Sequence, residues 1–399
     1  MNTNLITICE SETILKLTSE NRKLFEMLED FALRNNSVMR PVIENGEKVI
    51  KAANYVGIVK LNDGTVIEIL PKLAGKKAGS FSEPKKLVYQ MLSALLGIPY
   101  NDRDTVDMNE TFLEYFISVF ARECMKIIKS GLLSGYVSVE ENMTAVQGNI
   151  LFAENIRKNL VHRERLYVRH DVFSPDRAEN RLIKSTASLM MKLSKSHRSS
   201  QNLKQILAYL DDVKFSADYD VDFSKCVNTR NAKKYSIVLN ICRLFLKNHN
   251  FSEYHGKYVA YAMLFPMEDV FKSYIAGLIK KNVHKTVKTQ INGEYLFSKP
   301  EMFTLRPDIV IYDEGKPSCI VDTRWQIIEK KNDISADDMC RLYAYAQKFN
   351  CSEIVMIYPE SSEKLTELPE CYCVDSDEKI HIHIRFAQLY GNDKSVISP

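Results

Sequence analysis

LRPDIVIYDEGKPSCIVDTRW, residues 305–325, contains two apolar runs that are separated by a short polar segment rich in turn residues. The runs Leu305–Tyr312 and Ser318–Trp325 predict two buried strands joined by that turn. Each predicted strand carries one aspartate: Asp308 precedes three apolar residues, and Asp322 follows three others. A carboxylate in a buried strand is costly unless it has a partner. The sequence therefore predicts a site at which both aspartates find one.

Two aspartates on adjacent strands can share one Mg²⁺, with oxygens at roughly 2.1 Å. Alternate side chains of a strand share a face, so we expect Asp322 and Arg324 on one side and Thr323 and Trp325 on the other. The spacing Pro-Asp and then Asp-x-basic is typical of PD-(D/E)xK nucleases. In such a site the carboxylates hold the metal, and the metal polarises a phosphate and activates water.

The predicted catalytic residues are therefore Asp308, Asp322 and Arg324, and the predicted Mg²⁺ ligands are Asp308 and Asp322. An alternative interpretation is a buried salt bridge from Arg324 to one of the aspartates, without catalysis.

The elements around this stretch predict the order helix, three strands, helix, strand. The aspartates would lie on the second and third strands of this order. The expected elements are a helix over 266–283, strands over Glu294–Phe297, Leu305–Tyr312 and Ser318–Trp325, a helix over Asp337–Phe349 and a strand over Glu353–Tyr358. A last strand, Ile380–Phe386, is expected after them.

The rest of the chain predicts a β-rich beginning and a helical middle. Asn21–Arg34 has the apolar spacing of a helix, and Tyr55–Val59 and Thr65–Leu70 flank an Asp-Gly turn typical of a hairpin. The predicted fold class is α/β (α+β). The predicted domains are residues 1–83, β-rich and partner-binding, residues 84–250, mainly helical, and residues 251–399, nuclease-like.

Composition excludes several classes of protein. The formal net charge of +3 does not by itself indicate nucleic-acid binding, so a basic surface must be local. We find neither a signal peptide nor a membrane-length apolar run, which predicts a soluble, cytoplasmic protein without membrane contact. Cys371 and Cys373 lie near His381 and His383, a pattern that suggests a metal site, although alternation along a half-exposed strand is the simpler explanation.

Several segments resemble the McrC family, the nuclease subunit of the McrBC modification-dependent (5-methylcytosine) restriction system. These segments span nearly the whole chain. They are Asn54-Tyr55-Val56-Gly57, Glu68-Ile69-Leu70-Pro71-Lys72, Gln147-Gly148-Asn149-Ile150, Phe173-Ser174, Asn180-Arg181-Leu182, Phe265–Phe271, Arg306-Pro307-Asp308 and Asp322-Thr323-Arg324-Trp325.

The resemblance implies a Mg²⁺-dependent endonuclease subunit that binds an McrB-like AAA+ GTPase hexamer, stimulates its GTP hydrolysis and cuts double-stranded DNA bearing modified cytosine. The chain has no nucleotide-binding GxxxxGK[ST] loop, which agrees with a subunit whose partner binds and hydrolyses the GTP. Three residues depart from the family pattern: Arg324 replaces a lysine, Lys272 an acidic residue and Arg341 a glutamine. Glu268 or Asp269 would then replace the missing acid. The alternative is an adaptor that binds DNA and activates the GTPase without cutting.

Two basic runs are candidates for DNA contact. Lys281, Lys285 and Lys288 would share one face if the helix that begins near Pro266 extends through them, and such a stripe suits a phosphate backbone. A solvated helix face is the alternative. The second run contains Arg157, Lys158, Arg163, Arg165 and Arg169, with Tyr167 among them.

Overall fold

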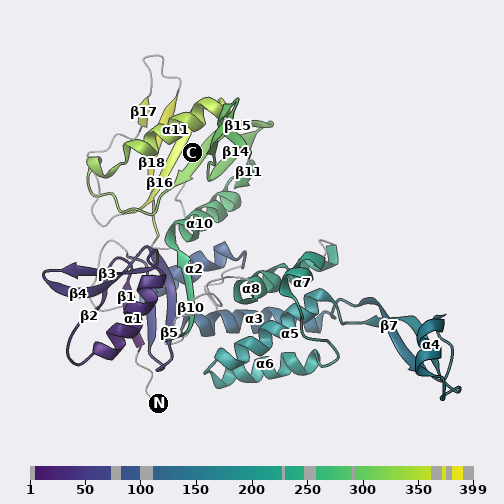
Figure 1. Ribbon diagram of the computed structural model, residues 1–399. Coiled ribbons are helices and arrows are strands. Elements are labelled where there is room, and N and C mark those ends of the chain that lie inside the picture. Colours follow the sequence, from purple (N-terminus) through teal and green to yellow (C-terminus); the bar gives the residue numbers. More distant parts are fainter. Residues whose placement is uncertain are drawn as a thin grey trace. The chain divides into compact units, whose positions relative to one another are not determined.

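The computed structural model describes residues 5–72, 82–98, 111–226, 230–246, 258–289, 291, 293–360, 371–373 and 380–389 (Figure 1). Its contacts divide the chain into two compact units, residues 1–109 with 252–399 and residues 110–251. The mixed α/β fold class is confirmed, whereas the predicted boundaries near residues 83 and 250 stay predictions. None of the described helices is long and apolar enough to cross a membrane.

The first unit begins with a four-stranded sheet of order β1-β6-β5-β10. Its strands are β1 (Leu5–Cys9), β5 (Tyr55–Leu61), β6 (Val66–Leu70) and β10 (Val259–Pro266). Strands β5 and β6 pair antiparallel around the Asp-Gly turn, so the predicted hairpin is confirmed. Beside this sheet, α1 (Arg22–Arg34) buries the apolar face that its sequence predicts, next to the three-stranded sheet of β2 (Thr13–Lys16), β3 (Met39–Glu44) and β4 (Glu47–Ala52).

A glycine in β5 allows the last strand of this sheet to approach. Gly57 has φ +138°, and a Cβ there would lie 1.9 Å from the carbonyl oxygen of Met263 on β10. No side chain fits at that distance, and positive φ is unfavourable for residues other than glycine. Gly57 therefore fixes the close pairing that leads the chain from β10 into the following helix.

The C-terminal part of the first unit is a six-stranded sheet of order β11-β14-β15-β16-β18-β17. Its strands are β11 (Thr286–Thr289), β14 (Ile309–Asp313), β15 (Lys316–Thr323), β16 (Glu353–Pro359), β17 (Cys371–Cys373) and β18 (His381–Ala387). Helix α10 (Met267–Asn282) leads into this sheet from β10 and also packs on α2 (Ser82–Leu95). Between β15 and β16 lie the short 3-10 helix η2 (Lys331–Asp333) and α11 (Ala336–Phe349). Ser335 caps α11 by accepting the backbone N–H of Asp338, and Asn350 ends it in the left-handed conformation.

Two predictions about this sheet are wrong. The strand β12 (Glu294–Ser298) does not join it but forms a separate hairpin with β13 (Glu301–Leu305). The edge strand is instead β11, which was not among the expected strands. Because α10 ends at Asn282, the predicted helical stripe does not form: Lys281 is on the helix, Lys285 follows it and pairs with Asp313 at 2.7 Å, and Lys288 lies over the ring of Tyr312. Their contact with DNA stays a prediction.

The second unit is a helical bundle with a projecting β-structure. The helices are α3 (Phe112–Lys129), α5 (Ala178–Leu193), α6 (His197–Tyr209), α7 (Tyr219–Lys225), the 3-10 helix η1 (Arg230–Tyr235) and α8 (Ser236–Leu246). Between α3 and α5 the chain forms β7 (Gly135–Met143), β8 (Asn149–Ile150), α4 (Phe152–Lys158) and β9 (Leu166–Ser174). We call residues 135–174 the arm. Within its unit, the arm extends away from the helices (Figure 1).

Candidate functional site

The predicted aspartates lie together at the ends of two paired strands. Asp308 directly precedes β14 and Asp322 is the next-to-last residue of β15, and β14 and β15 pair antiparallel with Ile309 opposite Val321. Both residues are buried, and the backbone N–H of Asp308 donates to Oδ1 of Asp322 at 3.4 Å. They line one cavity of about 210 Å³. The prediction that the fold brings the two carboxylates together is confirmed.

Thr323 holds Asp308 in position. Its backbone N–H and its hydroxyl both donate to Oδ2 of Asp308, at 2.9 and 2.7 Å. Along β15, Asp322 and Arg324 reach toward α11, where they pair with Arg341 and Asp338. Thr323 reaches Asp308, and Trp325 packs against Phe271 of α10. The predicted alternation of faces along this segment is thus confirmed.

Two cations that depart from the family pattern contact the aspartates. Nζ of Lys272, on α10, contacts Oδ1 of Asp308. The guanidinium of Arg341, on α11, donates to Oδ2 of Asp322 at 2.9 Å and pairs with Asp338 at 3.0 Å. Burial, and next the charge of Asp308, raise the pKa of Asp322 to about 7. Helices on the two sides of the strand ends thus neutralise the two carboxylates.

Arg324 does not contact either aspartate. Its Nε lies 3.5 Å from Asp338 and 3.9 Å from Glu268, so the alternative salt bridge from Arg324 to Asp308 or Asp322 is wrong. Glu268 also accepts the backbone N–H of Trp325 at 3.2 Å, and burial raises its pKa. Glu268 and Asp269 line the same cavity as the aspartates, which places a third acidic side chain where we expected one.

The donor set of this cavity suits a hard divalent cation. Asp308, Asp322 and Glu268 offer only carboxylate oxygens, the ligands that Mg²⁺ prefers. Lys272 and Arg341 contact the same carboxylates, so a bound ion must share Asp308 and Asp322 with these two cations or displace them. Arg306 and Thr323, which lie in segments that resemble the family, also line the site, as does Tyr345, and Asp338 pairs with Arg341 beside it. No local sequence pattern singled out Asp338 or Tyr345.

A second buried carboxylate anchors the segment that follows Asp322. Oε1 of Glu10 accepts the indole N–H of Trp325 at 2.6 Å and the backbone N–H of Lys72 at 3.0 Å. The ring of Trp325 packs edge-on against Phe271 of α10. The N-terminal sheet therefore holds the residue next to Arg324, and Glu10 is a contributor that sequence analysis missed.

The pH dependence of this contact can be predicted. Burial raises the pKa of Glu10 to about 7 despite the Trp325 and Lys72 hydrogen bonds, and the charge of Glu268 acts in the same direction. The neutral acid therefore favours the folded state below pH 4.5, and that stability is lost as the pH rises through 7. We expect Glu10→Gln to gain roughly 3 kcal/mol of stability relative to the native chain between pH 5 and pH 8.

Urea unfolding at the two pH values, followed by tryptophan fluorescence, measures this difference. Trp325 is the single tryptophan of the chain, so the signal reports on this contact. The same substitution at exposed Glu47 is the control. Equal pH dependence in the Glu10→Gln variant and the native chain would contradict the prediction.

Comparison with known proteins identifies the family. A model of the McrBC 5-methylcytosine restriction system component family matches residues 50–359. The chain belongs to this family. The predicted resemblance to McrC is confirmed. Among curated proteins, none matches the chain.

Two solved structures share the fold. One is a half-complex of Thermococcus gammatolerans McrB AAA+ hexamers with bound McrC, to which the chain is 18% identical with a TM-score of 0.66. That alignment covers 96% of this chain and 94% of the other. The second is the Thermococcus gammatolerans McrBC complex, at 17% identity and a TM-score of 0.51, covering 71% of this chain and 89% of the other. At these identities the likeness shows the fold alone.

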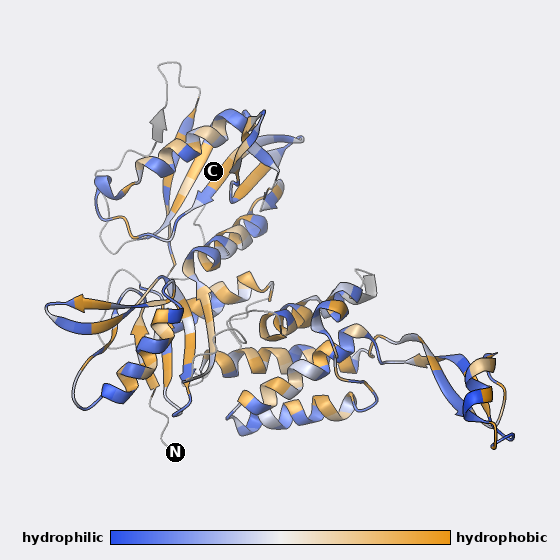
Figure 2. Cartoon of the chain, in the orientation of Figure 1, coloured by the Kyte–Doolittle hydropathy of each residue, from blue (hydrophilic) through white to orange (hydrophobic). Residues whose placement is uncertain are grey.

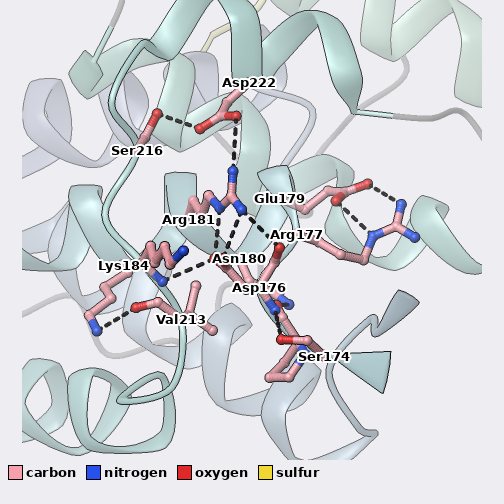
Figure 3. Close-up of polar contacts among 12 residues, drawn as sticks. Ser174, Asp176, Arg177, Glu179, Asn180, Arg181, Lys184, Val213, Ser216 and Asp222 are labelled. Carbon is pink, nitrogen blue, oxygen red and sulfur yellow. Dashed lines mark hydrogen bonds and ion pairs between the residues drawn. The ribbon is translucent and has the colours of Figure 1, made fainter. Parts of the chain in front are cut away.

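The segments of McrBC resemblance in the second unit have structural roles. Gly148, in the Gln147–Ile150 segment, has φ +75°, and a Cβ there would lie 2.3 Å from the carbonyl oxygen of Arg169. Only glycine permits this close approach of β8 to β9. Arg181 holds both oxygens of Asp176 at 2.7 Å, next to Ser174 at the base of the arm (Figure 3).

Asn180 joins the same network, and its loss gives a stability prediction. Its side-chain N–H groups donate to the carbonyls of Leu133 and Pro175, and its oxygen accepts the hydroxyl of Tyr235. Asn180 is fully buried. Asn180→Ala removes three hydrogen bonds at a buried site, which should cost about 2–4 kcal/mol of unfolding free energy. Urea unfolding followed by circular dichroism measures the loss, with exposed Gln201→Ala as the control; a loss equal to the control's refutes the prediction.

Proposed function

We propose that the chain is the DNA-cutting subunit of a GTP-dependent restriction complex, and that it cleaves DNA bearing modified cytosine with Mg²⁺ held by Asp308 and Asp322. The observation that carries this proposal is the pair of buried carboxylates, from neighbouring strand ends, in one polar cavity. Family membership, and the fold shared with a chain from an assembly of McrB and McrC, support the proposal that the chain acts within such a complex.

The residues around the cavity have distinct parts in this proposal. Thr323 fixes the Asp308 carboxylate, and Asp322 faces it across the strand pair. A bound Mg²⁺ would polarise the scissile phosphate and lower the pKa of a coordinated water. Because Arg324 faces Asp338 and Glu268, we assign the task predicted for it to Lys272, whose ammonium group contacts Asp308. Arg306 and Arg341 line the cavity and would hold phosphate charge.

One observation favours the adaptor as a second candidate. Lys272 and Arg341 contact the two carboxylates, as in a site where fixed cations have taken the place of a metal ion. An ion-paired site of this kind is stable without catalysis. The adaptor would still bind DNA and activate the GTPase.

A plasmid-nicking assay separates the two candidates. Native chain, an McrB-type AAA+ GTPase, GTP and Mg²⁺ are incubated with plasmid that carries 5-methylcytosine, and GTP hydrolysis is followed in the same tube. Nicking that requires Mg²⁺ supports the nuclease. Accelerated GTP hydrolysis without nicking supports the adaptor, and nicking without the partner would contradict both.

The arm is the part of the chain that we assign to partner binding. Large apolar side chains are exposed on it, and the arm carries hydrophobic as well as hydrophilic residues along its length (Figure 2). They are Tyr136, Val146, Phe152, Ile156, Leu160, Val161, Val172 and Phe173. Helix α4 buries none of its residues, although Phe152 and Ile156 are four apart and share one face. An exposed apolar surface of this kind is typical of a protein interface.

Residues 1–83, which we expected to bind the partner, have a different pattern of exposed apolar side chains. Their exposed large apolar side chains are scattered: Leu5, Leu33 and Ile43 belong to three different elements, and Leu17 follows the end of β2. Single exposed apolar residues are ordinary on any protein. The arm is therefore the better candidate for the surface that binds an AAA+ hexamer.

A further inference from the structure

Three titratable side chains meet on the C-terminal sheet away from the aspartates. Glu353 opens β16, and His381 and His383 lie on the neighbouring parallel strand β18. Oε1 of Glu353 lies 3.0 Å from Nδ1 of His381, and Oε2 lies 2.9 Å from Nε2 of His383. The alternation of β18 buries Ile382 and Ile384 on the other face. The two histidines therefore share a face with Glu353.

The geometry of this cluster is that of a metal site. One ligand atom from each of the three residues lies within 4.8 Å of the other two. Ligands of a tetrahedral Zn²⁺, each about 2.0–2.2 Å from the ion, lie roughly 3.4 Å from one another. Two imidazoles and one carboxylate form a common ligand set for zinc. Small movements of these half-buried side chains would therefore bring all three to one ion.

Hydrogen bonds alone do not satisfy the cluster. Nδ1 of His383 is buried and has no hydrogen-bond partner among the described residues. A neutral imidazole has one donor and one acceptor nitrogen, and the contact with Glu353 uses only one of them. Nε2 of His383 faces Glu353, so it is the nitrogen positioned to bind an ion next to this carboxylate.

The backbone register adds a third strand. Strand β17 pairs antiparallel with β18 and sets Cys371 opposite His383 and Cys373 opposite His381. The Cys-x-Cys and His-x-His segments that stood out in the sequence are thus direct neighbours in the sheet. The simpler explanation, alternation along a half-exposed strand, accounts for the spacing within β18 but not for Glu353.

We propose that Glu353, His381 and His383 bind one Zn²⁺ that links β16 to β18, with a water molecule as its fourth ligand. This site is separate from the proposed Mg²⁺ site, because the cavity beside Glu353 and His383 shares no lining residue with the cavity at Asp308 and Asp322. A bound ion would offset the single negative charge of Glu353 and add a metal bridge between β16 and β18 to the side-chain contacts already present.

Elemental analysis tests the proposal independently of nuclease activity. Untagged full-length chain is loaded with Zn²⁺, freed of excess metal on a desalting column and measured by mass spectrometry of the elements. We expect ~1 zinc per chain, and zinc affinity at least ~10-fold weaker in His383→Ala and Glu353→Ala. His197→Ala removes an exposed histidine elsewhere, and Asp308→Asn with Asp322→Asn empties the other site; both should keep the zinc.

Cobalt spectroscopy tests the site in the native chain, so its result does not depend on whether a variant folds. Co²⁺ bound by this ligand set should give the visible absorption of a tetrahedral ion, and Zn²⁺ should displace it. Removal of zinc in the presence of excess Mg²⁺ should lower the melting temperature of the native chain to that of His383→Ala. Native chain without zinc or a cobalt spectrum overturns the proposal, as does equal zinc in His383→Ala and the native chain.

Discussion

Replacement of Asp308 by asparagine is expected to abolish Mg²⁺-dependent nicking and to leave partner GTP hydrolysis unchanged. The substitution keeps an oxygen for the Thr323 hydrogen bonds but removes the negative charge that holds the cation. We expect the nicking rate to fall by at least ~100-fold, since one preorganised charge contact commonly contributes this much to catalysis. The same plasmid assay measures nicking and GTP hydrolysis together.

The matched control is Asp313→Asn on the same strand. Asp313 lies at the far end of β14 and pairs with Lys285 at the surface, so its loss should not change nicking. Lys272→Met adds a second comparison, because our assignment makes Lys272 necessary for cutting. If Asp308→Asn cuts as fast as the native chain, the proposed metal site is wrong, and if Lys272→Met does so, only the task given to Lys272 is wrong.

Two aspartates introduced on helix α4 are expected to abolish binding to the AAA+ partner. Phe152 is 72% and Ile156 is 65% exposed, so Phe152→Asp with Ile156→Asp should leave folding intact while charging the apolar face. Apolar anchors at protein interfaces commonly contribute ~2 kcal/mol each, which corresponds to at least ~30-fold weaker binding per residue. The affinity for the partner, loaded with a non-hydrolysable GTP analogue, is measured by light scattering or interferometry. Stimulation of the partner's GTP hydrolysis should fall together with this affinity.

Ile43→Asp is the control for this experiment. Ile43 is 72% exposed on β3 of the first unit, so it matches Ile156 in chemistry and exposure. If Ile43→Asp weakens binding to the partner and the α4 variant does not, the partner binds through residues 1–83, as the sequence suggested. Our assignment of partner binding to the arm would then be wrong. Thermal unfolding of both variants shows whether either has lost its fold.

Much of the first unit was predictable because its signals are local. The Asp-Gly turn between two apolar runs determines the β5–β6 hairpin, and the 3.6-residue spacing of Phe25, Leu28 and Phe31 determines α1. The pairing of Asp308 with Asp322 follows from two apolar strands joined by a short turn. In each case the residues that decide the structure lie within a few positions of one another.

The wrong predictions concern places where the local signal is ambiguous. The lysine spacing after residue 280 suits a helix, but Val283 takes an extended conformation and Thr286–Thr289 pairs with β14. The gain from completing the sheet edge outweighs a weak helical preference in that segment.

The sequence by itself determined the pair of strand-borne aspartates and the hairpin of the N-terminal sheet, because these depend on side-chain type and short spacings. Only the tertiary structure decided which cations meet the aspartates, that Glu10 holds Trp325, and that Glu353 joins His381 and His383. Those contacts link residues up to 315 positions apart in the chain. Charge and hydrogen-bond partners at such separations follow from packing of whole elements, which no local pattern of residues specifies.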